Sequence, residues 1–304
     1  MVIDFHTHIF PDKIAEKAIK TLEENLLLAS GNPDKAYLDG TLGDLLSSMN
    51  KNGISYSVIM PIATSTKQAE SINRFASEIT GKNNIISFGS VHPLQEDWLD
   101  YLEKIKESGL LGIKLHPEYQ GFYIDSPESI KVLTKAQELG LLVMLHTGED
   151  RGIKPPVHCT PKMLKNALNY VSGENIIAAH MGGYNMWEEV YEHLCDTPIF
   201  LDTSYAVGIM RDELTKAIIK KHGDDKILFG TDSPWQDQMD AVKALKNLNL
   251  GTETEDKIFY KNAQKLLEIW FYYFIMSNQR ILYNIWYVNC RNVTIIIQIM
   301  KFYC

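Results

Sequence analysis

Eight short apolar segments alternate with longer amphipathic segments along the first 269 residues of the chain. The apolar segments are rich in Ile, Val and Leu and are five to seven residues long, as expected for buried β-strands. They lie at residues 2–8, 56–60, 85–91, 112–116, 141–146, 176–180, 199–204 and 227–231.

The segments between these strands space their apolar residues as amphipathic helices do. We expect helices near residues 12–29, 41–52, 68–80, 96–108, 127–139, 161–172, 185–195, 211–222, 237–248 and 255–268. Two of them begin with a capping residue followed by proline, at Ser126-Pro127 and Thr160-Pro161. Glycine stands where a left-handed terminating residue is expected, at Gly53, Gly109, Gly140 and Gly173.

Strands that alternate with helices indicate a parallel sheet. Eight such units predict an α/β protein whose sheet closes into a (β/α)₈ TIM barrel. A doubly wound open sheet is the alternative, but its G-x-G-x-x-G turn is absent after the first strand, where His6 and His8 stand instead. We find no repeat or linker before residue 269 and therefore assign residues 1–269 to a single barrel domain.

The composition narrows the classes of function. The chain has 304 residues, 45% of them hydrophobic, with a net charge of −8 and a pI near 5.6. An acidic balance disfavours binding to nucleic acid. Four scattered cysteines without a C-x-x-C pair fit a reducing compartment, and no signal-peptide pattern precedes the first strand. We expect a cytoplasmic protein with no membrane or nucleic-acid partner.

Residues 270–304 differ abruptly from the rest of the chain. They contain no Asp, Glu, Gly, Pro, Ala or His, but ten aromatic residues and seven isoleucines. Three interpretations stay open: a shifted reading frame, an extra element packed on the barrel, or a membrane contact. Arg280, Arg291 and Lys301 interrupt the apolar run before the ~20 residues that a membrane span requires. We treat this segment as an atypical C-terminal extension outside the catalytic fold.

Histidines and one aspartate stand at the ends of the predicted strands. His6 and His8 are two positions apart in a strand, so their imidazoles point to the same face. The remaining groups follow strands four, five, six and eight and are His116, His146, His180 and Asp232. Because the active sites of TIM barrels lie at the C-terminal ends of the strands, these side chains are expected to converge. Histidines with a carboxylate suit a divalent metal and metal-assisted hydrolysis.

At this point the sequence resembles the amidohydrolase superfamily, in its amidohydrolase-related branch of metal-dependent TIM-barrel hydrolases and decarboxylases. The motifs occur in family order and span residues 1 to about 269. They are Asp4-Phe5-His6-Thr7-His8, Gly112-Ile113-Lys114-Leu115-His116-Pro117, Leu145-His146-Thr147-Gly148, Ala179-His180-Met181-Gly182-Gly183 and Gly230-Thr231-Asp232-Ser233-Pro234.

The resemblance implies that one divalent ion is held by His6, His8, His146 and Asp232. Zinc is the expected metal, with manganese and iron as alternatives. The resemblance also implies that His180 lies beside the metal-coordinated water as a general acid/base. Asp232 can share this catalytic role, because a carboxylate on the metal can accept the proton of that water.

Lys114 leaves two interpretations open. Some members of the superfamily carboxylate a lysine on strand four, which then bridges a second metal ion. Alternatively, Lys114 is a cation that faces a carboxylate of the substrate. We expect a single metal, because this branch usually works that way, and we assign Lys114 and His116 to substrate binding. The loops that follow the strands add Tyr119, Arg151 and Trp235 to that set.

The predicted function is hydrolysis of a C–N or C–O bond, as in an amide or lactone, of a small molecule. The alternative is non-oxidative decarboxylation of an aromatic or unsaturated carboxylic acid at the same site. A metal-dependent nuclease is disfavoured because Lys114 and His116 stand where a carboxylate ligand is wanted. A barrel that only binds partners is disfavoured because all the candidate groups are intact. The family branch also leads us to expect a homodimer.

Overall fold

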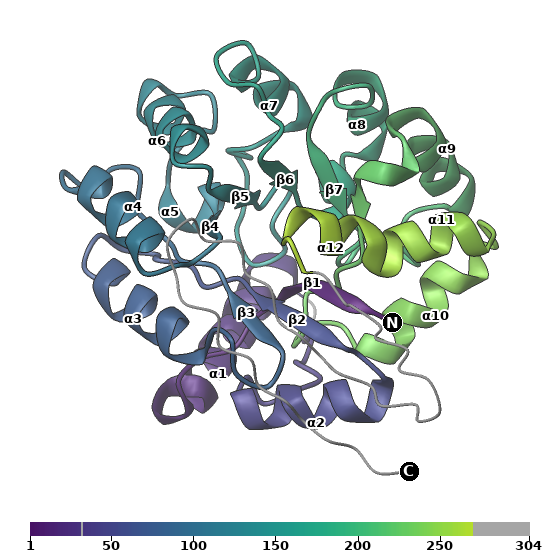
Figure 1. Ribbon diagram of the computed structural model, residues 1–304, viewed down its shortest axis with the longest axis horizontal. Coiled ribbons are helices and arrows are strands. Elements are labelled where there is room, and N and C mark those ends of the chain that lie inside the picture. The colour runs from purple at the N-terminus through teal and green to yellow at the C-terminus, as the bar shows by residue number, and fades with distance from the viewer. Residues whose placement is uncertain (32, 270–304) are drawn as a thin grey trace, which may run out of the picture.

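The computed structural model describes residues 1–31 and 33–269, which form a ring of parallel strands surrounded by helices (Figure 1). Each strand pairs with the next from β1 to β3 and from β4 to β8. All eight predicted strands are confirmed, although each ends between one and four residues earlier than predicted. Their bounds are β1 Ile3–Thr7, β2 Tyr56–Ile59, β3 Ile85–Ser87, β4 Gly112–Leu115, β5 Leu142–Leu145, β6 Ile176–Ala178, β7 Phe200–Asp202 and β8 Ile227–Leu228.

Two single bridges close the ring of strands. A parallel bridge between Gly89 and Ile113 joins the end of β3 to β4, and one between Thr7 and Ser233 joins β1 to the segment after β8. The N–H of Phe5 also donates to the carbonyl oxygen of Phe229 at 2.8 Å. The predicted (β/α)₈ barrel is therefore confirmed, and its first and last strands lie side by side.

The helices follow the predicted order and cover the outside of the strands (Figure 1). Their bounds are α1 Asp12–Ser30, α2 Leu42–Asn52, α3 Ala69–Ile79, α4 Trp98–Glu107, α6 Pro127–Glu138, α7 Pro161–Ala167, α8 Trp187–His193, α9 Asp212–His222 and α10 Gln238–Asn247. The last predicted helix consists of α11 Thr252–Asp256, the π-helical η3 Lys257–Lys261 and α12 Asn262–Leu266.

The predicted helix caps and terminal glycines are confirmed. The side chains of Ser126 and Thr160 accept hydrogen bonds from the N–H groups of Ser129 and Met163, which satisfies orphan donors of α6 and α7. Gly53, Gly109, Gly140 and Gly173 all have positive φ. Three short elements were not predicted: α5 Pro117–Gln120, which begins inside an expected loop, and the 3₁₀ turns η1 His180–Gly182 and η2 Asp224–Lys226.

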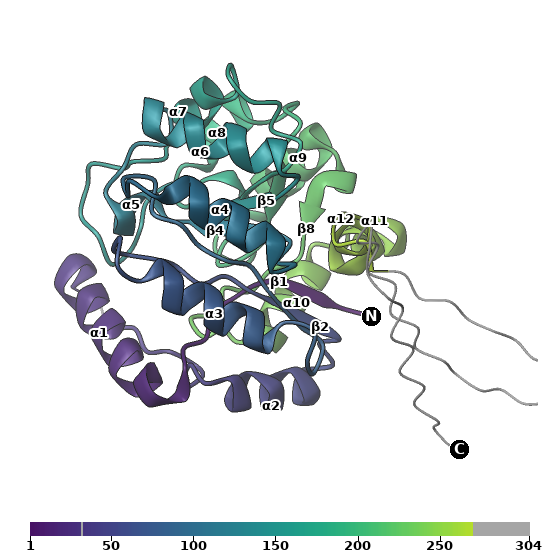
Figure 2. The same ribbon diagram turned by 60° about the vertical axis from the view of Figure 1, so that its left-hand side comes forward.

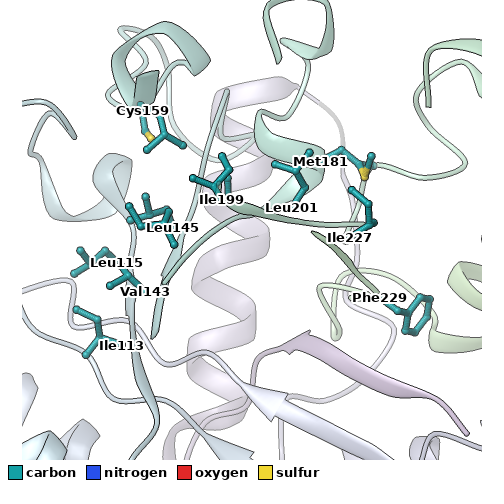
Figure 3. Close-up of a cluster of buried hydrophobic side chains, with 14 of the residues drawn as sticks. Ile113, Leu115, Val143, Leu145, Cys159, Met181, Ile199, Leu201, Ile227 and Phe229 are labelled. Carbon is teal, nitrogen blue, oxygen red and sulfur yellow. The ribbon is translucent and has the colours of Figure 1, made fainter. Parts of the chain in front are cut away.

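The buried core has two layers. Ile113, Leu115, Val143 and Leu145 belong to the layer between the strands and the surrounding helices (Figure 3). Met144 lies between Val143 and Leu145 in sequence but belongs to the second cluster, with Val58, Phe88 and Ile177. Adjacent strand residues therefore face opposite sides, and this alternation directs Lys114 and His116, like Met144 and His146, away from the helices.

Helix α1 lies on the opposite side of the barrel from α11, α12 and the N-terminus (Figure 2). Among the described residues, no helix combines the length and apolar composition needed to cross a bilayer. The predicted C-terminal extension, residues 270–304, lies outside the described residues.

Candidate metal centre

The predicted chemical groups meet in one cavity of about 590 Å³ at the C-terminal ends of the strands. β1 carries His6 and is followed by His8, β4 carries Lys114, and the remaining groups come one to four residues after the ends of β4, β5, β6 and β8. All of them line the cavity: His6, His8, Lys114, His116, His146, His180 and Asp232.

Three donor atoms form a nearly equilateral triangle. The Nε2 atoms of His6 and His8 are 3.2 Å apart, and Oδ1 of Asp232 lies 3.1 Å from Nε2 of His8 and 3.4 Å from Nε2 of His6. In a tetrahedral zinc site with bonds of 2.0–2.1 Å, neighbouring ligand atoms are about 3.3 Å apart. The triangle therefore already has the dimensions of one face of such a site. We call His6, His8 and Asp232 the first triad.

The first triad is oriented by groups behind it. Nδ1 of His8 lies 2.7 Å from the carbonyl oxygen of Met60, and Nδ1 of His6 lies 2.8 Å from Oδ2 of Asp202. Because both oxygens can only accept, each ring carries its hydrogen on Nδ1 and directs the Nε2 lone pair into the triangle. A ligating histidine that donates its other N–H to a carbonyl or carboxylate is the usual arrangement around protein-bound metals.

Electrostatics keep the first triad in its ligating form. Burial, reinforced by the charge of Lys114, lowers the pKa of His6 well below its ordinary value, so its imidazole is neutral. Burial alone would raise the pKa of Asp232, but the hydrogen bond with His8 and the electrostatic attraction of the surrounding imidazoles lower it below the ordinary value. A neutral imidazole and a carboxylate that converge on one point are stabilised by a bound cation, and the donor set fits zinc or manganese.

Asp4 ties β1 to the segment that carries Asp232. Its fully buried carboxylate accepts hydrogen bonds from Oγ1 of Thr231 at 2.7 Å and from Nε2 of Gln238 at 2.8 Å. The N–H of Asp232 donates to the carbonyl oxygen of His6 at 2.8 Å. Burial raises the pKa of Asp4 to about 7 in spite of these hydrogen bonds. These contacts fix Asp232 relative to His6.

His180 stands beside the first triad in a fixed orientation. Its Nδ1 lies 2.9 Å from the carbonyl oxygen of Ser204, so Nδ1 carries the hydrogen of the neutral ring and Nε2, which faces Nδ1 of His146 at 3.1 Å, is the proton-accepting nitrogen. The backbone N–H of His180 donates to Oδ1 of Asp202 at 3.0 Å. The structure also places His180 in the left-handed region, with φ of 58°, which few residues other than glycine occupy. The same carboxylate, Asp202, thus contacts both His6 and His180.

A second group of three ligand-type residues lines the same cavity. Nε2 of His116 lies 3.4 Å and Nε2 of His146 lies 3.8 Å from Oδ2 of Asp150, and the two rings stack with centroids 4.1 Å apart. We call His116, His146 and Asp150 the second triad. Burial lowers the pKa of both histidines well below the ordinary value, so both are neutral.

His146 belongs by its geometry to the second triad. Its Nε2 faces the carbonyl oxygen of Glu149 at 3.3 Å, and its Nδ1 faces Nε2 of His180 at 3.1 Å. The structure therefore brings His6, His8 and Asp232 together and sets His146 apart from them, across His180. The role of His146 as a fourth ligand stays a prediction.

Lys114 is buried in the centre of the site. Its Nζ lies 3.1 Å from Nε2 of His6, and the side chain is almost fully inaccessible. Burial lowers the pKa of Lys114 to about 8, although Asp202, Asp232 and Asp150 favour its charged form. With a pKa of about 8, Lys114 is mainly an ammonium group near neutral pH, and it loses its proton more readily than an exposed lysine.

The predicted substrate-binding residues all line the cavity, but they differ in the contacts that their side chains already make. Tyr119 stacks edge-on against His116 with ring centroids 4.6 Å apart. Trp235 forms part of the wall directly after the first triad. Arg151 is already engaged by the carboxylate of Asp34 and the hydroxyl of Tyr205. Its predicted contact with a substrate would require an exchange of these partners.

Sequence reasoning missed Asp202, Ser204 and Asp150. Asp202 ends β7, so the rule that functional groups follow barrel strands would have found it. The hydroxyl of Ser204 lies 2.9 Å from Nδ1 of His6 and 3.1 Å from Nδ1 of His180. Asp150 lies in an irregular loop, where no periodic pattern indicates which way a side chain points.

Solved structures similar to this chain share its fold. A TIM-barrel protein from Bordetella bronchiseptica has a TM-score of 0.67 and 14% identity, over 88% of this chain and 98% of its own. A 5-carboxyvanillate decarboxylase from Novosphingobium aromaticivorans with bound manganese has a TM-score of 0.65 and 15% identity, over 88% of this chain and 97% of its own. A probable 2-pyrone-4,6-dicarboxylic acid hydrolase from Acinetobacter baumannii has a TM-score of 0.60 and 18% identity, over 87% and 98%.

At these identities the likeness shows the fold, while the choice between hydrolysis and decarboxylation is left open. No curated protein sequence matches the chain. The sequence model of the amidohydrolase family matches residues 3–269, from β1 to the residues after α12. The resemblance in the strand-end motifs is thereby confirmed, and the chain belongs to the amidohydrolase family.

Proposed function

We propose that this protein is a metal-dependent hydrolase that cleaves a C–N or C–O bond, as in an amide or lactone, of a small molecule. The observation that supports it most is the first triad, whose three donor atoms are 3.1–3.4 Å apart and whose rings present Nε2. His6, His8 and Asp232 would hold one divalent ion, zinc first and manganese or iron as alternatives. When bound, such an ion lowers the pKa of a coordinated water from near 16 to about 7.

His180 is the residue placed to move protons. Its Nδ1 hydrogen is committed to the carbonyl oxygen of Ser204, which leaves the Nε2 lone pair as the only proton acceptor on the ring. We assign it the general base that takes a proton from the attacking water and returns it to the leaving group. Asp232, a carboxylate by its lowered pKa, can share the first of these transfers.

The remaining polar groups would bind and orient the substrate. Lys114 offers a buried donor beside His6, and His116 offers a donor beside Asp150. Lys114 and His116 are themselves buried, which strengthens the interactions that each can make.

A decarboxylase is the second candidate, and Lys114 is the observation that favours it. A buried ammonium group 3.1 Å from Nε2 of His6 would pair well with a carboxylate placed against the metal centre. The reaction would then release carbon dioxide, and the carbon would take up a proton from solvent, relayed through Nε2 of His180.

The test is a substrate screen of the metal-loaded protein against lactones, amides and aromatic carboxylates. Hydrolysis predicts that one oxygen of ¹⁸O-labelled water enters the product, and that the His180→Asn variant loses turnover while it keeps the metal. Carbon dioxide release without incorporation of solvent oxygen would replace the first candidate by the second. Protein that takes up no metal would contradict both.

A further inference from the structure

The cavity extends beyond the polar centre into an apolar compartment. At about 590 Å³ it is as large as the sites that hold drug-sized ligands. On one side lie the charged and imidazole groups described above. On the other side the lining is apolar and comes from α1 and from the segments that follow β1 and β2: Ile9, Phe10, Leu22, Leu26, Met60 and Ile62.

The apolar face of α1 packs against the protein in the first half of the helix and lines the cavity in the second half. Ala15, Ile19, Leu22 and Leu26 are spaced three or four residues apart, so they share one face of the helix. Ala15 and Ile19 are buried, and the Cβ that a side chain would add at Gly40 would lie only 2.9 Å from Ile19. The first half of α1 is therefore closely packed against the protein.

The second half of the apolar face is packed against the cavity instead. Leu22 and Leu26 are only partly buried, in contrast to Ala15 and Ile19. Both line the cavity. Two leucines at helical spacing that face a cavity rather than a core are an apolar binding wall.

The charges near this compartment are already paired within the protein. Lys35 donates to Glu23 at 2.6 Å, and Arg151 pairs with Asp34. The rim beside α1 therefore presents no unpaired cation among these residues, and it does not favour an anionic group at this end of the substrate.

We propose that the substrate is elongated, with its reacting polar group at the first triad and an alkyl or aryl group seated against Leu22 and Leu26. This inference rests on the proposed function for the position of the polar group. It assigns Leu22 and Leu26 as residues that determine specificity, and it places the apolar group of the substrate between α1 and the segments after β1 and β2.

The experiment uses a series of straight-chain hydroxamic acids, from acetohydroxamate to hexanohydroxamate. The hydroxamate group chelates divalent metals whatever reaction the enzyme catalyses, and each added methylene probes the apolar compartment. Binding is measured by titration calorimetry on the full-length, zinc-loaded protein. Burial of one methylene is worth about fourfold in affinity, so we expect a gain of at least tenfold along the series.

The variants Leu22→Asn and Leu26→Asn place a polar amide in the wall. We expect them to bind acetohydroxamate like the wild type and to lose at least fivefold of the chain-length gain. Leu28→Asn is the matched control, because Leu28 lies on the same helix with 77% of its surface exposed. It makes the same chemical change and should leave the gain within twofold.

A series without chain-length dependence in the wild type would overturn the inference, and so would equal losses in Leu26→Asn and Leu28→Asn. Failure of the proposed function looks different: acetohydroxamate would bind the zinc-loaded and the metal-free protein equally weakly. The dependence of affinity on chain length would then be measured on the metal-free protein. A gain in affinity with chain length that is lost in Leu26→Asn would still support the apolar wall. No gain with chain length would contradict it.

Discussion

The first and second triads have the same composition, two histidines and one aspartate, in one cavity. They differ in spacing and in the partners of their rings. The donor atoms of the first triad are 3.1–3.4 Å apart, whereas those of the second are 3.4 and 3.8 Å from the shared carboxylate oxygen. Composition alone would assign a metal to both.

The ring partners separate the two triads. In the first, both Nδ1 atoms face acceptors, so both Nε2 atoms are lone-pair donors. In the second, Nδ1 of His116 accepts a hydrogen bond at 3.3 Å from the N–H of Tyr119, at the N-terminus of α5. Neutral His116 therefore carries its hydrogen on Nε2, where a metal would need a lone pair.

The comparison shows that the hydrogen-bond partner of Nδ1 determines whether Nε2 of a neutral histidine carries a lone pair or a hydrogen. The first triad is prepared to hold a cation. The second is a hydrogen-bonded group, in which Nε2–H of His116 points toward Asp150. The predictions below test this division.

The largest effect should separate the two aspartates. Asp232→Asn removes the anionic ligand of the first triad, and we expect its zinc affinity to fall by a factor of about 1000 or more. Asp150→Asn makes the same change in the second triad and should leave the metal content close to that of the wild type. Elemental analysis of both variants, purified side by side, checks the pair; equal losses of metal would erase the distinction between the triads.

The next effect concerns the chemical step. His180→Asn should keep the metal and lower turnover by about 10²–10⁴, the usual worth of a general acid/base. His116→Asn, in the second triad, should change turnover far less and act mainly on substrate affinity. Steady-state kinetics with the substrate found by screening, combined with metal analysis, distinguishes these results. Loss of metal in His180→Asn would make His180 a ligand rather than a base.

A smaller effect is expected behind the first triad. Asp202→Asn leaves an amide where a carboxylate holds Nδ1 of His6, and such partners are typically worth 10–100-fold in metal affinity. Competition with a chromophoric chelator measures the change. A variant with unaltered affinity would show that the orientation of His6 does not depend on this carboxylate.

Much of the barrel was predictable from the sequence because its signals are local. Strand periodicity, the proline and serine or threonine at helix starts and the terminal glycines depend only on near neighbours. They placed all eight strands and every described α-helix longer than four residues. The short helix α5 was not predicted, because its four residues show no periodicity and its first turn is capped by the ring of His116.

The site was predictable only in part. The rule that functional groups follow barrel strands located His6, His8 and Asp232, which the structure brings together. It could not show that Asp202, 196 positions from His6, fixes the hydrogen on that ring. Nor could it separate His146 from the first triad, since its distance from the other groups depends on how the strands close into a ring.

The smallest effect concerns the protonation of Glu118, whose carboxyl group is buried in the folded protein. Burial raises the pKa of Glu118 to about 7, although its carboxylate accepts a hydrogen bond from the N–H of His158; Asp150 adds to the rise. The folded state therefore favours protonated Glu118, and stability is lost as the pH rises from about 4.5 through 7.

Glu118→Gln removes this titration. The quantity to compare is the free energy of unfolding of the variant minus that of the wild type. We expect this difference to increase by about 2 kcal/mol between pH 5 and pH 8. Urea unfolding at the two pH values measures the difference. A stability difference that is the same at both would mean that Glu118 is ionised in the folded protein across this range.

The most direct test of the central claim is anomalous diffraction from crystals of the zinc-loaded protein, measured at the zinc absorption edge. The division between the triads predicts one peak, about 2.0–2.2 Å from Nε2 of His6, Nε2 of His8 and a carboxylate oxygen of Asp232. A peak among His116, His146 and Asp150 instead, or no peak at the first triad, would contradict it.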